Sequence, residues 1–359
     1  MVKSLTLSAA VTALAFAGLV PADAQGSRTP PGPCPVYKSP EVKEHIDAAY
    51  KAIGTDLPQQ LIPALFIVPR GAGLCAPDRV AAFSMNPAKL QPTQAFDQLY
   101  WVGSENVGSW ALKTSGGIIL FDAMNNSDDA ANIVEPGLKQ LGLDPKDVKY
   151  IVVTHGHGDH WGGTKYFQDK YGTKILVGAP DVALLNMAPP ANSTRRGPAP
   201  PHVDQAVTDG TALTLGQTTV HLYLSAGHTP GSVSAIFPVT DHGTAHMVSM
   251  YGGYGLPSQL GPDTGSPPRH SGLETYIKSA ERFRDLGIAA GVDVAISTHP
   301  FFDDTIGKVK QVAASGRAAI SPWVMGKANW LRFENASIEV AKTVEAEEKE
   351  HPVAERTPG

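Results

Sequence analysis

The feature that most constrains this chain of 359 residues is a set of three histidines and one aspartate within six positions. The segment His155–His160 reads His-Gly-His-Gly-Asp-His and comes directly after Tyr150–Val153, an apolar run typical of a strand. Imidazole and carboxylate groups bind zinc, and ligands so close in sequence converge only in a tight turn, which the interleaved glycines permit. We therefore expect a metal site just after a strand. A solvated loop of histidines is the alternative.

Two further histidines follow predicted strands. His228 lies in the Gly/Pro-rich segment Ser225–Ser232, after the alternating run Thr219–Leu224. His299 follows the apolar run Val292–Ile296. Ligands and catalytic groups of layered α/β sheets collect where strands end. Each histidine alone would be an ordinary loop residue, but together with the first set they predict one metal-binding site.

The ordered motifs His-x-His-x-Asp-His, Gly-His-Thr-Pro-Gly and Thr-His-Pro resemble the signature of the metallo-β-lactamase superfamily, over roughly residues 99–320. The resemblance implies a four-layer αββα sandwich with two zinc ions per chain at the edge between two sheets. It assigns His155, His157 and His228 to one zinc, and Asp159, His160 and His299 to the other. It also implies that Asp122, after Gly117–Phe121, braces the ligands from behind. A turn or N-cap aspartate is the alternative.

Departures from the superfamily pattern narrow the class. Most of its hydrolases, including glyoxalase II-type thioesterases and homoserine-lactone hydrolases, place a metal-bridging aspartate on the strand between the last two histidines. The segment Ala245–Gly253 has neither an acid nor a cysteine there, so the chain resembles class B, subclass 3, metallo-β-lactamases. Di-iron relatives need a glutamate where His157 stands. The 29 Lys and Arg against 34 Asp and Glu give a net charge of −5, which disfavours nucleic-acid and other polyanionic partners.

The resemblance implies a dizinc hydrolase in which zinc-bound hydroxide attacks the carbonyl of a small-molecule substrate, a β-lactam amide. Zinc lowers the pKa of bound water far below that of bulk water, towards ~7. Asp159 would be both a ligand and the catalytic residue that orients the nucleophile. Ser249 and Tyr251 lie where the subclass grips the substrate carboxylate, and Trp161 would line the site; cleft-wall and packing roles are equal alternatives. A hydrolase of another lactone, ester or amide, and a non-catalytic zinc-binding protein, stay open.

Residues 1–24 predict a cleaved secretory signal peptide. Lys3 gives a basic start, Leu5–Val20 is apolar, and Ala22–Ala24 fits a small-x-small cleavage site. A retained membrane anchor is the alternative. Export implies a periplasmic or secreted protein with no stable membrane insertion after cleavage. In that oxidising compartment the only two cysteines, Cys34 and Cys75, are expected to form a disulfide, with two free thiols as the alternative.

Three regions are expected after the signal peptide. Residues 25–95 predict an N-terminal extension that packs outside the catalytic domain and contains one amphipathic helix, Glu41–Ile53. Residues 96–332 predict the hydrolase domain, and residues 333–359 a helical tail that frays at the surface. The turn-rich segments Ala188–Pro198 and Gly255–Gly272 are either lids over the cleft or solvated linkers. The sequence does not indicate the oligomeric state.

Apolar periodicity within residues 96–332 predicts a layered α/β domain in two halves. Strands are expected at Leu99–Val102, Ser109–Lys113, Gly117–Phe121, Tyr150–Val153 and Lys174–Val177, then at Ala212–Leu215, Thr219–Leu224, Val233–Phe237, Ala245–Met250 and Val292–Ile296. Helices are expected at Asp128–Leu141, Gly163–Tyr171, Leu273–Leu286 and Thr305–Ala314. Pro136 should distort the first of these helices.

Overall fold

The computed structural model describes residues 39–55, 57, 86–186, 198–257 and 269–350. The expected signal peptide, both cysteines Cys34 and Cys75, most of the N-terminal extension and the central parts of the two turn-rich segments lie outside these residues. Among the described helices, none is both long enough and apolar enough to cross a bilayer.

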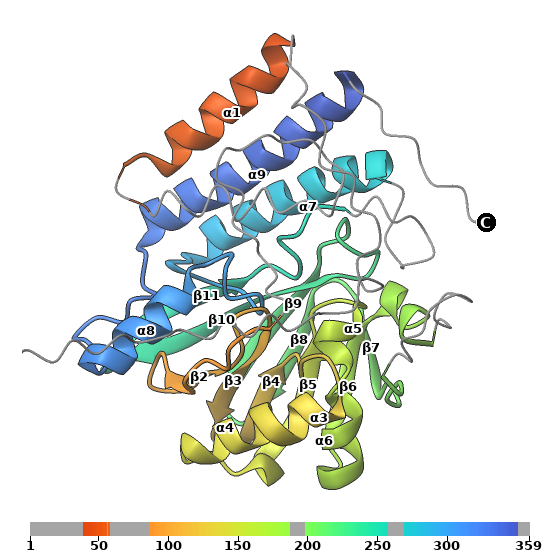
Figure 1. The fold of residues 1–359 in the computed structure, drawn as a ribbon, viewed down its shortest axis with the longest axis vertical. Coiled ribbons are helices and arrows are strands. Elements are labelled where there is room, and N and C mark those ends of the chain that lie inside the picture. The colour runs from red at the N-terminus through yellow and green to blue at the C-terminus, as the bar shows by residue number, and fades with distance from the viewer. Residues whose placement is uncertain (1–38, 56, 58–85, 187–197, 258–268, 351–359) are drawn as a thin grey trace, which may run out of the picture. The chain divides into compact units, whose positions relative to one another are not determined.

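Two sheets form the middle of the described fold (Figure 1). The first has seven strands in chain order: β1 (Thr93–Gln94), β2 (Leu99–Gly103), β3 (Gly108–Thr114), β4 (Gly117–Phe121), β5 (Val148–Val153), β6 (Lys174–Gly178) and β7 (Gln205–Val207). Its strands are antiparallel from β1 to β4 and parallel from β4 to β7. The second sheet, in spatial order, contains β12 (Val294–Ile296), β11 (Thr244–Met250), β10 (Val233–Asp241), β9 (Thr218–Leu224) and β8 (Thr211–Leu215). Only its β11–β12 pair is parallel.

The two sheets pack face to face through a shared apolar core. Phe121 of β4 stacks on Phe237 of β10 with ring centroids 5.2 Å apart. Trp110 of β3 belongs to the same buried cluster as Val248 of β11 and Ile296 of β12. Separate apolar clusters cover the outer face of each sheet. Strands such as β4 are thus buried on both faces, which explains their continuous apolar sequence. The expected four-layer αββα sandwich is confirmed.

Short helices cover the outer face of the first sheet: α3 (Ser127–Asp129), a π-helical turn η2 (Ala130–Val134), α4 (Glu135–Gln140) and α6 (Thr164–Tyr171). The helix expected at Asp128–Leu141 is therefore interrupted, as predicted. Pro136 has no N–H to donate to the carbonyl four residues earlier, and the turn before it widens. The connections contain α5 (Gly158–Trp161) and the 3₁₀ turns η3 (Pro145–Asp147), η4 (Ala179–Asp181) and η5 (Leu184–Asn186).

Three long helices lie on the side of the second sheet: α7 (Arg269–Ala290), α9 (Lys327–Glu350) and α1 (Pro40–Ile53) (Figure 1). Helix α8 (Thr305–Ser315) follows β12. Ser39 caps α1 by accepting a hydrogen bond from the backbone N–H of Glu41, and α1 packs along α9.

The expected C-terminal tail is helical up to Glu350, but this helix lies in the core and not at a fraying surface; residues 351–359 lie outside the described residues. Helix α9 begins at Lys327, so the expected boundary between residues 332 and 333 falls inside it. Its side chains Trp330, Phe333 and Val344 are at most 1% exposed, because α1 and α7 cover it from two sides. The C-terminal helix is part of the core that supports the second sheet.

Candidate metal centre

The six histidine and aspartate side chains lie together where strands of both sheets end. His155 and His157 lie between β5 and α5, Asp159 and His160 lie in α5, His228 follows β9, and His299 follows β12. The structure gathers them into two groups of three, within each of which the ligand atoms lie within 4.8 Å of one another: His155, His157 and His228, and Asp159, His160 and His299. Each group therefore combines residues from both sheets.

The three-histidine group is preorganised by the backbone behind it. The Nε2 atoms of His155 and His228 are 3.1 Å apart, and His155 Nδ1 lies 2.8 Å from the carbonyl oxygen of Gly252. A Cβ atom at Gly253 would lie 2.7 Å from the His228 ring. Position 253 must therefore be glycine for the backbone to lie against the imidazole. Burial lowers the pKa of His157 to about 4, and holds the pKa of the other two imidazoles well below the usual value. All three are neutral at pH 7.

In the second group, one carboxylate faces two imidazoles. The Nε2 atoms of His160 and His299 are 3.1 Å apart, and Asp159 Oδ2 lies 3.5 Å and 3.6 Å from them. His299 Nδ1 lies 2.7 Å from the carbonyl oxygen of Asn106. Burial lowers the pKa of His299 to about 4. Burial also opposes ionisation of Asp159, but the neighbouring histidines outweigh it and lower the pKa of this carboxyl below its usual range.

The hydrogen bond on the far side of one ring in each group, that of His155 and that of His299, indicates that a cation fits there. A carbonyl oxygen only accepts, so Nδ1 of His155 and of His299 must carry the hydrogen, and Nε2 of each neutral ring presents a lone pair to the centre. Two nitrogens facing each other at 3.1 Å need a proton or a metal ion between them. Tetrahedral zinc with Zn–N distances of ~2.0–2.1 Å separates its nitrogen ligands by roughly 3.3 Å.

Asp122 is the buried brace of the second group. Its carboxylate accepts hydrogen bonds from the backbone N–H and hydroxyl of Thr154, both at 2.7 Å, and lies 2.6 Å from His160 Nδ1. Burial alone would lower the pKa of His160, but the carboxylates of Asp159 and Asp122 raise it. Asp122 does not cap α3, whose N-cap is Asn126. Its backbone φ of 60° holds the carboxylate in place at a conformational cost.

The structure places the three expected substrate-contacting residues in the core instead. Ser249 is fully buried, and its hydroxyl accepts a hydrogen bond from Trp330 Nε1 at 2.8 Å. Tyr251 is 4% exposed and packs among Tyr254, Tyr276 and Phe283. Neither side chain opens to a substrate, because α7 and α9 cover this end of β11, so that expectation is corrected.

Trp161 is also buried, with 6% of its surface exposed, and its indole N–H donates to the carbonyl oxygen of Gly156 at 2.9 Å. Of the two roles considered for it, the structure shows the packing one. By holding that carbonyl, Trp161 steadies the segment between His155 and His157.

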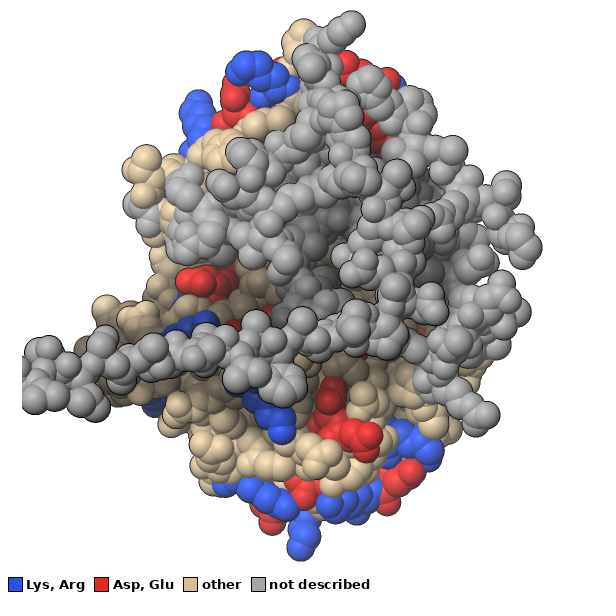
Figure 2. Space-filling view, in the orientation of Figure 1, with Lys and Arg blue, Asp and Glu red and all other residues tan. Residues whose placement is uncertain are grey.

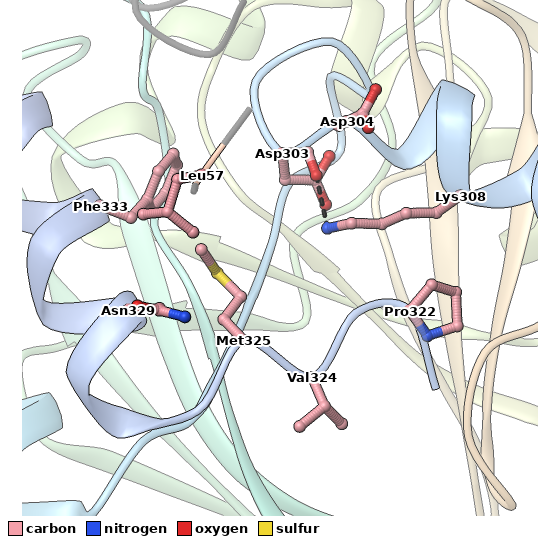
Figure 3. Close-up of a pocket in the computed structure, with 9 residues that line it drawn as sticks. All are labelled: Leu57, Asp303, Asp304, Lys308, Pro322, Val324, Met325, Asn329 and Phe333. Carbon is pink, nitrogen blue, oxygen red and sulfur yellow. Dashed lines mark hydrogen bonds between the residues drawn. The ribbon is translucent and has the colours of Figure 1, made fainter. Parts of the chain in front are cut away.

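The sequence reasoning missed Asp303, which holds the loop that carries His299. Its buried carboxylate accepts hydrogen bonds from the backbone N–H of Ser297 at 3.2 Å and from the hydroxyl of Thr305 at 2.7 Å. Burial raises its pKa to about 6. It lies beside a cavity of about 190 Å³ between the start of α8 and α9, where Lys308 Nζ donates to the Asp303 carbonyl (Figure 3). An acid a few residues after an apolar strand was the available signal.

Figure 2 shows the charged side chains on one face of the molecule. On the face in view in Figure 2, acidic and basic side chains are interspersed across the described residues. A polyanion would need a continuous basic area. Among the described residues on this face, no such continuous area is seen.

The fold and the site are similar to those of known proteins. Residues 103–241 match the model of the metallo-β-lactamase superfamily. Among solved structures it is similar to a subclass B3 metallo-β-lactamase of Bradyrhizobium japonicum, with 27% identity and a TM-score of 0.57 over 68% of this chain and 90% of that chain. A native metallo-β-lactamase from Legionella gormanii shares the fold, with 21% identity and a TM-score of 0.62 over 74% of this chain and 99% of that chain.

Curated relatives carry a different name. A hydroxyacylglutathione hydrolase of Brucella anthropi is 32% identical over 127 residues, which are 34% of this chain and 42% of the relative. A protein of the same name from Acidiphilium cryptum is 28% identical over 31% of this chain and 45% of its own length. The chain thus spans less than half the length of these relatives.

Proposed function

We propose that the protein is a dizinc hydrolase that opens the amide bond of β-lactams. The observation that carries the proposal is the contact between two ligand groups: the rings of His155 and His160 lie 3.8 Å apart, centroid to centroid. Three protein ligands for each ion leave coordination positions open, as catalytic zinc sites do, whereas structural sites are closed by four. This favours an enzyme over a non-catalytic zinc-binding protein.

Each residue would have a separate task. When bound, the zinc ions supply a Lewis acid and an activated water. His155, His157 and His228 would hold one ion, and as neutral imidazoles they would leave its positive charge uncompensated. Asp159, His160 and His299 would hold the other. Asp159 keeps its negative charge and would accept a hydrogen bond from the attacking water, which orients it towards the substrate carbonyl. Asp122 would keep His160 in one orientation.

The end of β11 favours a β-lactam over a thioester. The strand passes from Met250 through Tyr251 into Gly252 and Gly253, which contact His155 and His228 through backbone atoms and add no carboxylate between the two groups. The similarity to subclass B3 structures supports the same choice. Hydrolysis of a hydroxyacylglutathione thioester is the second candidate, favoured by the curated relatives.

Turnover assays distinguish the two candidates. Zinc-loaded protein should hydrolyse a chromogenic cephalosporin, a penicillin or a carbapenem, lose this activity to a chelator, regain it with zinc, and resist serine-directed inhibitors. Asp159→Asn should keep much of its zinc and lose most of kcat. Hydrolysis of a hydroxyacylglutathione thioester or a lactone, with every β-lactam left intact, would reject the β-lactam proposal and leave the metal chemistry standing.

We also propose export to the periplasm or the medium, with a disulfide between Cys34 and Cys75. The basic start, apolar run and cleavage site in residues 1–24 support export. Protein from the native host should begin near Gln25 and show no free thiol until reduced. An intact Met1, or two titratable thiols in the native state, would contradict these proposals.

A further inference from the structure

Asp181 is a buried acid that none of the chemistry above uses. It is the last residue of the 3₁₀ turn η4, which follows β6, and it is 0% exposed. Its turn approaches the His228 loop at backbone contact, since a Cβ atom at Gly178 would lie 1.9 Å from the carbonyl oxygen of Gly231. Only glycine permits so close an approach of two loops.

The Asp181 carboxylate binds both loops that deliver the three-histidine group. Its Oδ2 accepts hydrogen bonds from the backbone N–H of Gly156 at 2.7 Å and from the hydroxyl of Thr229 at 2.6 Å. Its Oδ1 accepts one from the backbone N–H of Gly231 at 2.6 Å. Gly156 lies between His155 and His157, and Thr229 follows His228. One carboxylate therefore joins the first-sheet ligands to the second-sheet ligand.

This arrangement parallels that of Asp122 in the other group. Asp122 accepts from the Thr154 backbone and faces His160, whereas Asp181 contacts only the backbone and hydroxyl groups beside the ligands. A buried carboxylate that accepts three short hydrogen bonds holds its donors more firmly than neutral acceptors would. Without it, the three donors would be left unsatisfied or would separate, and the 3.1 Å spacing between His155 and His228 would be lost.

We infer that Asp181 is a positioning residue for the three-histidine metal site: it fixes the distance between the His155–His157 segment and the His228 loop, and so sets the metal affinity of that group. The inference rests on the proposed zinc site but not on the β-lactam substrate. It predicts an effect on one metal group and not on the other.

Zinc binding to the full-length protein tests the inference directly. In a competition titration with a chromophoric chelator, wild-type protein should release two ions. Asp181→Asn replaces one acceptor oxygen by an N–H₂ group that faces donors. It should lower the binding affinity for one of the two ions 10- to 100-fold, the usual effect of losing a residue that holds the metal ligands in place. The visible absorption of cobalt(II) in that site should change with it. Asp122→Asn, as the matched variant, should weaken the other ion.

A milder pair of variants covers the case in which Asp181→Asn does not fold. Thr229→Val removes one hydrogen bond to Asp181 at nearly constant volume, whereas Thr229→Ser keeps the hydroxyl. Thr229→Val should lower the affinity for the same ion and shift the cobalt spectrum, whereas Thr229→Ser should keep the affinity and the spectrum of the wild type. Wild-type affinity for both ions in the Asp181 and Thr229→Val variants would overturn the inference, as would an equal loss at both sites. Zinc binding without β-lactam turnover would refute only the proposed substrate.

Discussion

Glu334 is a carboxylic acid buried in the core. It lies in α9, is 1% exposed, and accepts a hydrogen bond from the Tyr254 hydroxyl at 2.9 Å. Burial raises its pKa to about 7, although the Tyr254 hydrogen bond and the charge of Arg284 act in the opposite direction. At pH values between ~4.3, the pKa of glutamate in the unfolded chain, and about 7, the native state therefore holds a proton that the unfolded chain has released. The free energy of unfolding should fall as pH rises between these two values.

Glu334→Gln removes this titration and keeps the acceptor oxygen. We expect the variant to have a higher Tm than the parent at pH 8 and nearly the same Tm at pH 5, with both proteins zinc-loaded. Thermal unfolding at the two pH values measures the difference. Glu44→Gln, at an exposed glutamate of α1, is the control and should show no such pH dependence. An equal change in Tm at both pH values for Glu334→Gln would contradict the assignment.

Ser249→Ala tests whether the Ser249 hydroxyl stabilises the core or contacts the substrate. Its hydroxyl accepts from Trp330 Nε1 and donates to the Val294 carbonyl oxygen. Ser249→Ala should leave KM and kcat unchanged and lower the free energy of unfolding by ~1–3 kcal/mol, because the indole N–H loses its acceptor. Urea unfolding and steady-state kinetics measure the two effects. In a Trp330→Phe background the same change should cost much less; a raised KM for Ser249→Ala would instead return this residue to the substrate site.

The six clustered ligands could be predicted from sequence because four of them lie within six positions and each of the other two follows an apolar run. Asp181 and Asp303 were missed, because some of their partners are backbone N–H groups whose positions depend on how the loops fold. Ser249 and Tyr251 were misplaced for a related reason. Position along β11 does not show which helices cover its end.

At the scale of elements, α7 and α9 meet at a contact that depends on one glycine. Gly287 lies in α7, and a Cβ atom there would lie 2.2 Å from the Trp330 ring of α9. On an exposed helix, glycine to alanine stabilises by ~1 kcal/mol. Here Gly287→Ala should instead destabilise by ~1–3 kcal/mol, because the ring is fully buried and cannot move aside.

Denaturant unfolding measures this change, and a second background provides the control. With Trp330→Leu already present, Gly287→Ala should be neutral or stabilising, because the smaller side chain leaves room for the methyl group. A stabilising effect of Gly287→Ala alone would mean that the two helices pack less closely.

The strands were the most predictable elements because each expected strand has a clear apolar or alternating pattern. The strands β1 and β7 were missed because they are only two and three residues long and partly polar. The burial of helix α9 was not predicted, because its sequence shows only one apolar stripe, as a surface helix does. In the structure its buried residues surround much of its circumference, because α9 contacts both α1 and α7.

At the scale of the whole molecule, zinc should stabilise the fold as well as support its chemistry. Each ligand group joins both sheets, so unfolding must release the ions. A ligand at 100 times its Kd adds ~2.7 kcal/mol to stability. We expect a chelator to lower the Tm and added zinc to restore it, with a shift that grows with free zinc concentration. Differential scanning calorimetry measures it. His299→Ala should show a smaller shift, and an unchanged Tm on chelation would exclude metal binding between the sheets.

The distribution of ligands between the sheets has one further consequence. The turn at Thr208–Gly210 separates β7, the last strand of the first sheet, from β8 in the second. A polypeptide divided at this turn would leave four of the six ligands in one fragment and two in the other, and neither fragment could complete a group of three from both sheets. Reassembly of such a split protein would then be governed by zinc, and the association of its halves would report the free zinc concentration around it.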